Sequence, residues 1–303
     1  MQTNPPESAE AVIARLTAEF DAFSAQLQRA ARFLIDNPRE VGVQSMRALA
    51  SKAEVHPNTL VRLAQAIGYD GYEPMRERFR DFMVTEGLGG YRDRADWLHE
   101  MAERGGAAEV VARMAEATST NIEAMWQGQD PAKLEAIADA MLGAKRVYVL
   151  GMGAAYALAH KFWYVARMGF ENIVPIPRHG SQPIDDVAGI GPQDLLVALT
   201  FQPYRSETLI AVDFARDAGA TVVGVSDSVT SPLIRVADFA LVSPTHTPQI
   251  FESHAAVTAL MEGLLAIMVA RAPGDVAERI EAFHKRRLDA GLYVEAAPLA
   301  GLG

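Results

Sequence analysis

Residues 146–157 read RVYVLGMGAAYA and decide the fold of the C-terminal half of the chain. Residues 146–150 form a short apolar run that ends at Gly151, and Gly153 follows two positions later. Such a run, closed by a glycine-rich turn and followed by helix-forming residues, predicts a strand, a turn and the start of a helix. Glycines let a backbone approach an anion, and a helix N-terminus favours negative charge, so the turn is a candidate anion-binding site.

Similar apolar runs recur along the chain and alternate with helical stretches. Strands are predicted at 172–176, 194–200, 220–226 and 238–243, and helices at 132–142, 154–168, 182–189, 206–218, 231–236 and 253–271. Continuous apolar strands separated by helices are typical of a parallel sheet covered on both faces. We therefore predict an α/β fold class, with a doubly wound five-stranded parallel sheet whose ligand lies beyond the carboxyl ends of the strands.

The preceding part of the chain is all-helical in pattern. Apolar residues spaced three and four apart predict helices at 10–22, 25–36, 45–53, 57–67 and 71–84, and no strand is predicted before residue 145. The cluster Glu86–Gly90 predicts a domain edge, followed by a helical connector at 92–127 with a break at Gly105-Gly106. The predicted organisation is a helical domain at 1–86, a helical linker at 87–129, an α/β domain at 130–272, and a C-terminal helix and tail at 273–303.

Bulk composition sets limits on the location and chemistry of the protein. The 303 residues suggest about two domains, and the absence of cysteine excludes disulfides and thiolate metal sites. The first twelve residues lack the basic and apolar regions of a secretory signal, and the apolar stretch 255–270 is short and interrupted by Glu262. We therefore expect a cytoplasmic location and no membrane partner.

Residues 45–64, SMRALASKAEVHPNTLVRLA, predict a helix, a tight turn and a second helix. Leu49, Ala50 and Ala53 give the first helix an apolar face of mostly small residues, and Pro57 suits the first position of the second helix. In a DNA-binding helix-turn-helix the second helix reads base edges and the first crosses the backbone, although ordinary helix packing gives the same spacing. The candidate DNA-binding residues are Arg47, Lys52, His56, Pro57, Asn58, Thr59 and Arg62.

The distribution of charge favours DNA binding over ordinary packing. The whole chain carries −10, but residues 29–80 contain nine Lys and Arg against six acids, so this stretch is +3 and the remainder is −13. Neutralisation of phosphates supplies much of the affinity for DNA, which a locally basic domain can provide. Further cations in this stretch are candidates either for backbone contact or for pairing between protomers: Arg29, Arg32, Arg76, Arg78 and Arg80.

The N-terminal motif resembles that of RpiR-family bacterial regulators. The stretch Gly68-Tyr69-Asp70-Gly71-Tyr72 has the pattern Gly-[Phe/Tyr]-x-Gly-[Phe/Tyr] that follows the recognition helix in that family. One departure is His56, where family members often have a serine N-cap; histidine is a poorer cap and can contact phosphate instead. The other matching residues are Asp36-Asn37-Pro38, Val41, Ser45-Met46, Leu49-Ala50, Ala53, Val55, Thr59, Arg62-Leu63 and Ile67.

Residues from about 130 to 270 resemble SIS (sugar isomerase) domains, which bind phosphosugars and follow the helix-turn-helix in RpiR regulators. The resemblance rests on Gly151-Met152-Gly153, Gly219–Ser228, Ser231-Pro232-Leu233 and Ala237-Asp238. The fold alone would also suit a dinucleotide, but Tyr156 occupies the position of the third glycine and no acid ends the second strand. We therefore expect no cofactor.

The phosphate-binding loops depart from the SIS pattern. Ala155 stands where a serine is usual, and the loop that usually reads Ser-x-Ser-Gly-x-Thr-x-Glu is here TFQPYRSE, residues 200–207. Arg205 either replaces the lost hydroxyls with a bidentate guanidinium or pairs with Glu207 as a solvated loop residue. The effector is thus expected to be a phosphosugar, a sugar acid or a polyol. The candidate effector-binding residues are Gly151, Gly153, Ala154, Ala155, His179, Ser181, Thr200, Gln202, Tyr204, Arg205, Glu207, Glu252 and His254.

The two resemblances together imply a non-enzymatic regulator of carbohydrate metabolism. Its partners are expected to be operator DNA, a carbohydrate-derived effector and a second copy of the chain, as a dimer or tetramer. Two alternatives stay open: a phosphosugar isomerase with an accessory helical domain, and a helical protein-interaction domain fused to a sensor. An isomerase needs a general base, for which Glu207, Glu252 and His254 are the candidates. The sequence shows no metal-ligand spacing.

Overall fold

The computed structural model describes residues 5–85 and 91–293. By its internal contacts the chain divides into two compact units. The N-terminal unit comprises Met1–Ser119 together with His246–Ser253, and the C-terminal unit comprises Thr120–Thr245 together with His254–Gly303. The predicted domain edge at Glu86–Gly90 lies outside the described residues, and the bounds of the four predicted segments remain predictions.

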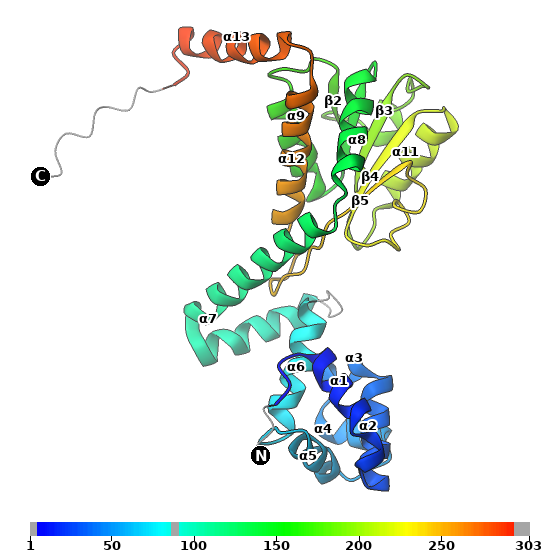
Figure 1. The fold of residues 1–303 in the computed structure, drawn as a ribbon, viewed down its shortest axis with the longest axis vertical. Coiled ribbons are helices and arrows are strands. Elements are labelled where there is room, and N and C mark those ends of the chain that lie inside the picture. The colour runs from blue at the N-terminus through cyan, green and yellow to red at the C-terminus, as the bar shows by residue number, and fades with distance from the viewer. Residues whose placement is uncertain (1–4, 86–90, 294–303) are drawn as a thin grey trace, which may run out of the picture. The chain divides into compact units, whose positions relative to one another are not determined.

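The N-terminal unit is a bundle of helices around one apolar core (Figure 1). Two details of the predicted helix pattern were wrong. The helix expected at 10–22 ends at Ala18, because a separate 3-10 turn follows it, and the short helix Pro38–Val43 was not predicted. The elements are α1 (Ala9–Ala18), the 3-10 helix η1 (Phe20–Ala22), α2 (Ala25–Asp36), α3 (Pro38–Val43), α4 (Met46–Lys52), α5 (Pro57–Ala66) and α6 (Tyr72–Thr85).

Helix α7 (Tyr91–Gln127) runs from the N-terminal unit into the C-terminal unit. Its helical geometry is interrupted at Gly106, whose φ of 64° and ψ of −162° lie outside the helical region. A residue with a side chain rarely adopts this φ, whereas glycine does so at little steric cost. The predicted break at Gly105-Gly106 is therefore confirmed, and α7 consists of two helical halves.

The C-terminal unit contains a five-stranded parallel sheet in the order β2-β1-β3-β4-β5, which confirms the predicted fold class. From β1 the chain leads to β2 on one side of it and then to β3 on its other side, so the topological switch point lies between β1 and β3. In doubly wound sheets of this order, ligands bind at that point. The strands are β1 (Val147–Gly151), β2 (Ile173–Ile176), β3 (Leu195–Leu199), β4 (Thr221–Ser226) and β5 (Phe239–Val242).

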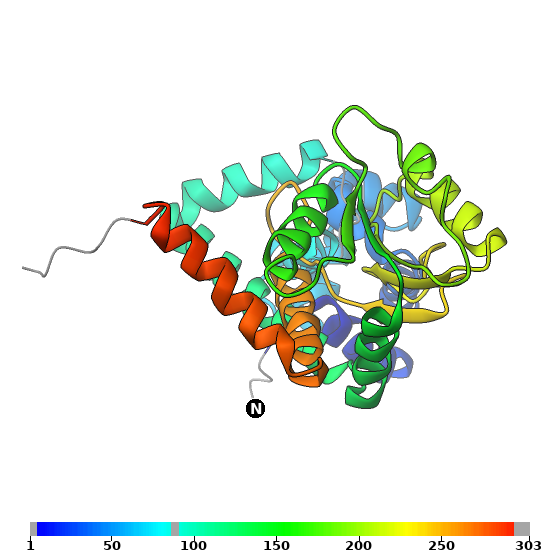
Figure 2. The same cartoon turned by 90° about the horizontal axis from the view of Figure 1, so that it is seen from above.

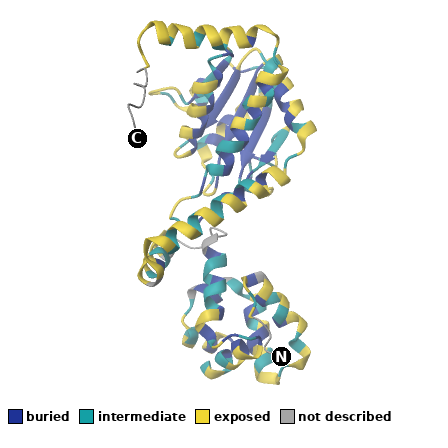
Figure 3. Ribbon diagram, turned by 60° about the vertical axis from the view of Figure 1, so that its left-hand side comes forward, coloured by how far each residue is buried: buried dark blue, intermediate teal, exposed yellow. Residues whose placement is uncertain are grey.

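Helices cover both faces of this sheet, so its central strands are fully buried (Figure 3). One layer consists of α8 (Pro131–Gly143), α9 (Ala155–Ala166) and α12 (Ala255–Arg271). The other contains α10 (Pro183–Asp186) and α11 (Ser206–Asp217). Seen from above, α13 (Asp275–Asp289) runs outward from the end of α12 (Figure 2).

Two features of the C-terminal unit bear on the sequence predictions. The helix expected at 231–236 is wrong: these residues form turns, in which the amides of Arg235 and Val236 bond to the carbonyls of Ser231 and Leu233. Among the described residues, no single helix is long and apolar enough to cross a membrane; α12 and α13 satisfy the length and composition only jointly, across a bend of 117°.

The stability of the N-terminal unit at alkaline pH depends on the buried side chain of Tyr72. Its ring is 3% exposed, its hydroxyl has no hydrogen-bond partner among the described residues, and burial raises its pKa to about 12. In the unfolded chain the Tyr72 hydroxyl ionises near pH 10, whereas in the folded chain it stays neutral up to about pH 12. Burial of the neutral hydroxyl therefore contributes stability that is fully present below pH 10 and is lost as the pH rises to about 12.

We expect Tyr72→Phe to leave stability at pH 7 unchanged or raised, because it removes a buried hydroxyl. Between pH 10 and 12, the free energy of unfolding of the variant should also fall by up to about 2.7 kcal/mol less than that of the wild type. Urea unfolding of both proteins at several pH values in this range measures the difference. Parallel pH curves for the two proteins would contradict the expectation.

Candidate DNA-binding surface and effector site

Helices α4 and α5 form the predicted helix-turn-helix. The Ser45 side chain caps α4 by accepting a hydrogen bond from the Ala48 amide at 3.3 Å. At the other end, the Val55 amide donates to the Ala50 carbonyl at 2.9 Å, with Glu54 in the left-handed region at φ 54°. This is the hydrogen bond of a Schellman motif, which ends a helix and turns the chain sharply. It directs the chain into α5.

His56 is the N-cap of α5, which corrects the expectation that histidine would serve poorly there. Its Nδ1 accepts a hydrogen bond from the Asn58 amide at 3.3 Å, and Pro57 occupies the first helical position. The imidazole thus takes the capping role usually filled by a hydroxyl. His56 remains exposed, so its Nε2 edge is still available to a ligand.

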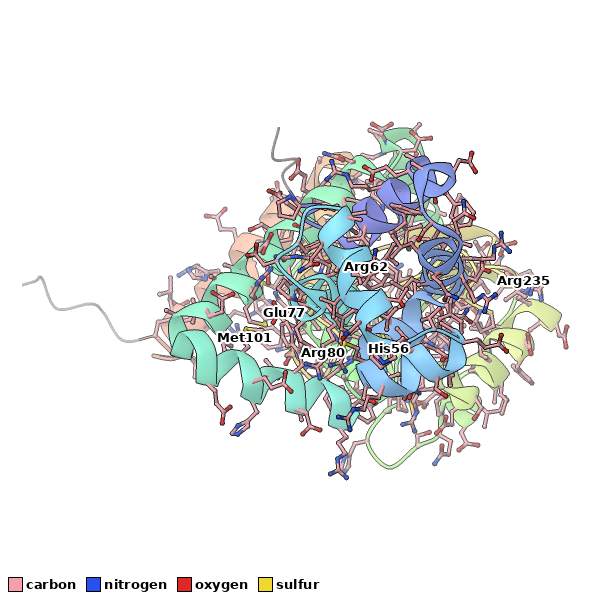
Figure 4. The ribbon with its side chains drawn as sticks, turned by 90° about the horizontal axis from the view of Figure 1, so that it is seen from below. His56, Arg62, Glu77, Arg80, Met101 and Arg235 are labelled. Carbon is pink, nitrogen blue, oxygen red and sulfur yellow. The ribbon has the colours of Figure 1, made fainter. Side chains whose placement is uncertain are left out.

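The two faces of α5 differ in burial. Leu60, Leu63 and Ala64 are fully buried against the other helices, whereas Asn58 and Arg62 are exposed and Thr59 is half-buried. Figure 4 shows Arg62 and His56 on this helix. An exposed face carrying amide and guanidinium groups near the start of a second helix is suited to the major groove.

The residues after α5 explain the Gly-Tyr-x-Gly-Tyr pattern. Gly68 has φ 101°, and the Tyr69 amide bonds to the Ala64 carbonyl at 3.1 Å, so Gly68 ends the helix in the left-handed conformation. Tyr69 and Tyr72 are both buried in the core of the unit. The pattern therefore anchors the end of α5 through two buried tyrosines, and Asp70 is its one exposed residue.

The predicted cations divide into two groups. Arg47 and Arg62 are exposed and form no ion pair among the described residues, whereas Lys52 pairs with Glu40 at 2.6 Å. The arginines of α6 face acids of their own chain: Arg76–Glu73 at 3.2 Å, Arg78–Asp81 at 3.8 Å and Arg80–Glu100 at 2.7 Å. Arg29 donates to the Glu54 carbonyl at 3.5 Å, and Arg32 lies over the Phe20 ring.

A cavity of about 290 Å³ lies where α6 meets the first half of α7, and Figure 4 labels three of its lining residues. Within it, the Trp97 indole donates to Asp81 at 3.2 Å, and Arg113 lies 4.0 Å from the same carboxylate. Burial is the largest influence on the pKa of Asp81 and raises it. The lining is a network of paired charges, and it joins α6 to α7. Its residues are Glu77, Arg78, Arg80, Asp81, Trp97, Glu100, Met101, Gly105, Glu109 and Arg113.

In the C-terminal unit, the loop after β1 lies at the switch point of the sheet. A Cβ on Gly151 would lie 2.2 Å from the Ala155 carbonyl oxygen, so glycine is required for α9 to begin this close to the strand. Gly153 has φ 60°, which turns the chain into the helix. The start of α9 thereby points its positive end at the carboxyl edge of β1.

The loop after β3 converges on the same place. Gly151 of β1 is in register with Leu199 of β3, and Thr200 follows directly. The guanidinium of Arg205 lies beside the glycine turn, since a Cβ on Gly153 would be 3.9 Å from its Nη1. The structure thus brings together two of the predicted effector segments, Gly151–Ala155 and Thr200–Glu207.

Arg205 makes the ion pair that was one of its two sequence interpretations. Its Nη2 lies 2.7 Å from Glu207 Oε1, with the two side chains 48% and 36% exposed. The hydrogen bond from Arg205 lowers the pKa of Glu207. The pair is open to solvent, so an anionic ligand can compete with Glu207 for the guanidinium.

Hydroxyl groups hold these loops in place, and two of them, Ser226 and Ser231, were not predicted as site residues. The Ser226 hydroxyl, at the end of β4, donates to the Thr200 carbonyl at 2.6 Å and lies 2.8 Å from the Ser231 hydroxyl. The Arg205 amide donates to the Thr200 hydroxyl at 3.3 Å. Hydrogen bonding and charge connect Tyr204 to Asp227 and raise its pKa, although burial is the larger cause. Position at the carboxyl end of a strand was the signal for Ser226.

The remaining predicted effector residues lie in different surroundings. His254 caps α12, and its ring is 4.7 Å from the Phe201 ring, which places it beside the loop after β3. His179 is exposed, and the Ser181 hydroxyl bonds only locally, to the Gln182 carbonyl; no described hydrogen bond joins either residue to the glycine turn. Glu252 belongs to the segment that packs in the N-terminal unit. Gln202 is exposed on the loop after β3.

Comparison with known proteins agrees with this architecture. Residues 140–270 match the SIS domain family. The chain is 21% identical over 233 residues to an uncharacterized HTH-type transcriptional regulator of Haemophilus influenzae, covering 77% of this chain and 79% of the relative. It is also 28% identical over 145 residues to the isomerizing glutamine–fructose-6-phosphate aminotransferase of Pyrobaculum aerophilum, where the match spans 24% of the relative's length.

Two solved structures resemble the chain. The sugar isomerase domain of an RpiR transcription factor from Sphaerobacter thermophilus is 25% identical, with a TM-score of 0.54, and covers 60% of this chain and 99% of its own. The Vibrio vulnificus NanR protein complexed with ManNAc-6P is 18% identical, with a TM-score of 0.57, and shares its fold with 94% of this chain and 100% of its own.

These similarities confirm the resemblance to RpiR-type chains, in which a helix-turn-helix unit is followed by a SIS domain. Two of these relatives, from Haemophilus influenzae and Sphaerobacter thermophilus, are named as transcriptional regulators.

Proposed function

We propose that the chain binds operator DNA through α5 and that a carbohydrate-derived anion bound in the SIS domain controls its operator affinity. The observation that carries the proposal is the presence, in one chain, of an exposed polar face on α5 and a switch-point site lined by Gly153 and Arg205. The relatives named as transcriptional regulators support the first half. Cytoplasmic location and assembly into dimers or tetramers are part of the same proposal.

The effector is expected to carry a negative charge close to Arg205. The N-terminus of α9 and the Arg205 guanidinium both favour an anion there, and a phosphate or carboxylate can accept two parallel hydrogen bonds from the guanidinium. The NanR structure holds a sugar phosphate, so phosphosugars are the first ligands to test. Sugar acids share the anionic chemistry, and polyols serve as the uncharged comparison.

The surroundings of Glu207 speak against this residue as the general base of an isomerase. A general base works best with a pKa near the operating pH. The hydrogen bond from Arg205 instead lowers the pKa of Glu207, which leaves the carboxylate a weaker base than an ordinary glutamate. Assays with aldose and ketose phosphates are therefore expected to show no turnover, and isomerisation abolished by Glu207→Gln would overturn the proposal.

Operator binding is tested by selecting bound fragments from genomic DNA and titrating the chosen duplex at several salt concentrations. We expect sequence-selective binding that weakens steeply with salt, because phosphate contacts release counterions. The same titration is then repeated with each sugar phosphate, since an effector must change operator affinity. A chain that binds no duplex selectively, or binds without a salt slope, would contradict the proposal and favour a protein-interaction domain.

Arg205→Ala should weaken binding of an anionic effector roughly ten- to 150-fold, because hydrogen bonds to charged groups contribute about 1.5–3 kcal/mol. A thermal-shift screen of sugar phosphates, sugar acids and polyols supplies the ligand, which at a hundred times its Kd adds about 2.7 kcal/mol of stability. Arg235→Ala is the control, since it removes an exposed arginine elsewhere in the same unit. Equal affinity in the Arg205 and Arg235 variants would show that Arg205 is only a solvated loop residue.

A further inference from the structure

The segment His246–Ser253, between β5 and α12, packs in a different unit from the chain on either side of it. Residues 245 and 254 belong to the C-terminal unit, but the segment itself belongs by its contacts to the N-terminal unit. Arg94 Nη1 donates to the Ile250 carbonyl at 3.1 Å, and the rings of Tyr91 and Phe251 lie 5.5 Å apart. Further along, the Thr247 hydroxyl is 3.7 Å from the Met114 sulfur, so both halves of α7 hold the segment.

Arg94 marks this contact as specific. The residue is 5% exposed, and its Nε has no hydrogen-bond partner among the described residues. Removing a guanidinium from water is unfavourable unless other interactions compensate for it. An apolar residue would fill the same space without that cost. The hydrogen bond to the Ile250 carbonyl therefore accounts for an arginine at this position.

At its other end the segment continues directly into a residue that contacts the loop after β3. Ser253 is followed directly by His254, whose ring packs on Phe201 at 4.7 Å. Phe201 is 7% exposed and stands between Thr200 and Gln202 in the loop after β3. One peptide bond therefore separates the part of the chain held by α7 from the part that contacts the effector loop.

Within the N-terminal unit the path continues from α7 to α6. Trp97 and Glu100 lie on the half of α7 that carries Arg94, and they bond to Asp81 and Arg80 of α6 at 3.2 and 2.7 Å. Helix α6 packs in turn on α5 in the common core. Continuous packing of this kind offers a physical route by which a displacement can pass from one helix to the next.

We propose that His246–Ser253 is the element through which the effector site acts on the helical unit, with Arg94 and Tyr91 as the positioning residues that hold it on α7. The proposal rests on the function proposed above. An effector that shifts the loop after β3 displaces His254 through Phe201, and the segment cannot follow without changing its contacts with Arg94 and Tyr91. The alternative route, along the continuous helix α7 itself, predicts that these contacts do not matter.

The mechanical connection can be tested on the full chain without effector or DNA. Hydrogen exchange is measured for residues 91–105 in the wild type and in Phe201→Leu, which removes the ring from His254. We expect exchange in 91–105 to rise on the order of threefold or more, because their packing on the segment is loosened. Phe170→Leu is the matched control: it shortens another buried aromatic of the same unit, which is 6% exposed, and should leave 91–105 unchanged.

A second pair of variants isolates the contact itself. Tyr91→Ala is expected to fold, since the ring is 54% exposed, and should make exchange in 91–105 insensitive to Phe201→Leu. Arg94→Gln tests the buried contact in the same way, and Val111→Ala, 66% exposed on α7, should preserve the response. No response to Phe201→Leu, an equal response to Phe170→Leu, or a full response in Tyr91→Ala would overturn the inference. A wild-type chain that bound no operator would contradict the proposed function and leave this outcome unaffected.

Discussion

Replacing Arg62 with alanine is expected to weaken operator binding by about 5- to 150-fold, the loss of one bidentate contact to a base of roughly 1–3 kcal/mol. Arg62 is exposed on α5, forms no ion pair among the described residues and stands opposite the buried Leu60 and Leu63. The substitution removes no core contact, so helix content and unfolding midpoint should not change. Fluorescence anisotropy with the selected duplex measures the effect.

Two control variants give this prediction its specificity. Arg47→Ala, on α4, should weaken binding to all duplexes about equally and reduce the salt slope by about one, as expected for a phosphate contact. Arg92→Ala removes an arginine that is 93% exposed on α7 and should have little effect. If Arg62→Ala and Arg92→Ala bound the operator equally well, α5 would not be the recognition helix.

Gly151→Ala is expected to destabilise the C-terminal unit by about 3 kcal/mol or more, since forcing extra atoms into a packed site displaces the backbone. The added Cβ would lie 2.2 Å from the carbonyl oxygen and 2.6 Å from the carbonyl carbon of Ala155, and neither atom can rotate away as a side chain can. The start of α9 must therefore move, and effector binding should be lost with it. Thermal unfolding and the effector screen record the two consequences.

Other glycines of the same unit provide graded controls. A Cβ on Gly153 would meet only the Arg205 Nη1 at 3.9 Å, an ordinary contact, but the φ of Gly153 is 60°. Gly153→Ala should therefore cost only the strain of a left-handed alanine, about 1–3 kcal/mol. Gly189 has neither a positive φ nor a neighbour within 4 Å, and Gly189→Ala should be neutral or slightly stabilising. Equal effects at Gly151 and Gly189 would show that the close approach of α9 to β1 does not matter for stability.

The predictable part of this fold was the part that local pattern determines. Apolar runs of five to seven residues correspond to the five strands, and the Gly151-Met152-Gly153 turn identified the strand that lies at the switch point. The helix-turn-helix was recognisable because Leu60 and Leu63 repeat at helical spacing after a proline. Errors occurred where the signal was short: residues 38–43 form a helix of six residues, and residues 231–236 form turns.

Side-chain partners were the part that could not be predicted. The sequence left Arg76, Arg78 and Arg80 open as DNA or subunit contacts, and only the folded chain shows them beside Glu73, Asp81 and Glu100. His56 was judged a poor cap from its residue type, but its Nδ1 accepts the Asn58 amide. The Arg80–Glu100 pair requires α6 to meet α7, whereas Arg76–Glu73 and Arg78–Asp81 lie three residues apart within α6, a spacing that helical geometry permits but does not select.

The sequence by itself determined the two kinds of unit, the order of their elements and the edge of the sheet where we propose the effector site, because periodicity and glycine turns act over a few residues. The tertiary structure alone decided the rest: that Arg205 lies beside Gly153, and that His246–Ser253 packs on α7. These contacts join residues that are about fifty or more than one hundred positions apart. Their formation depends on how completed helices and strands pack, and no local pattern in the chain records it.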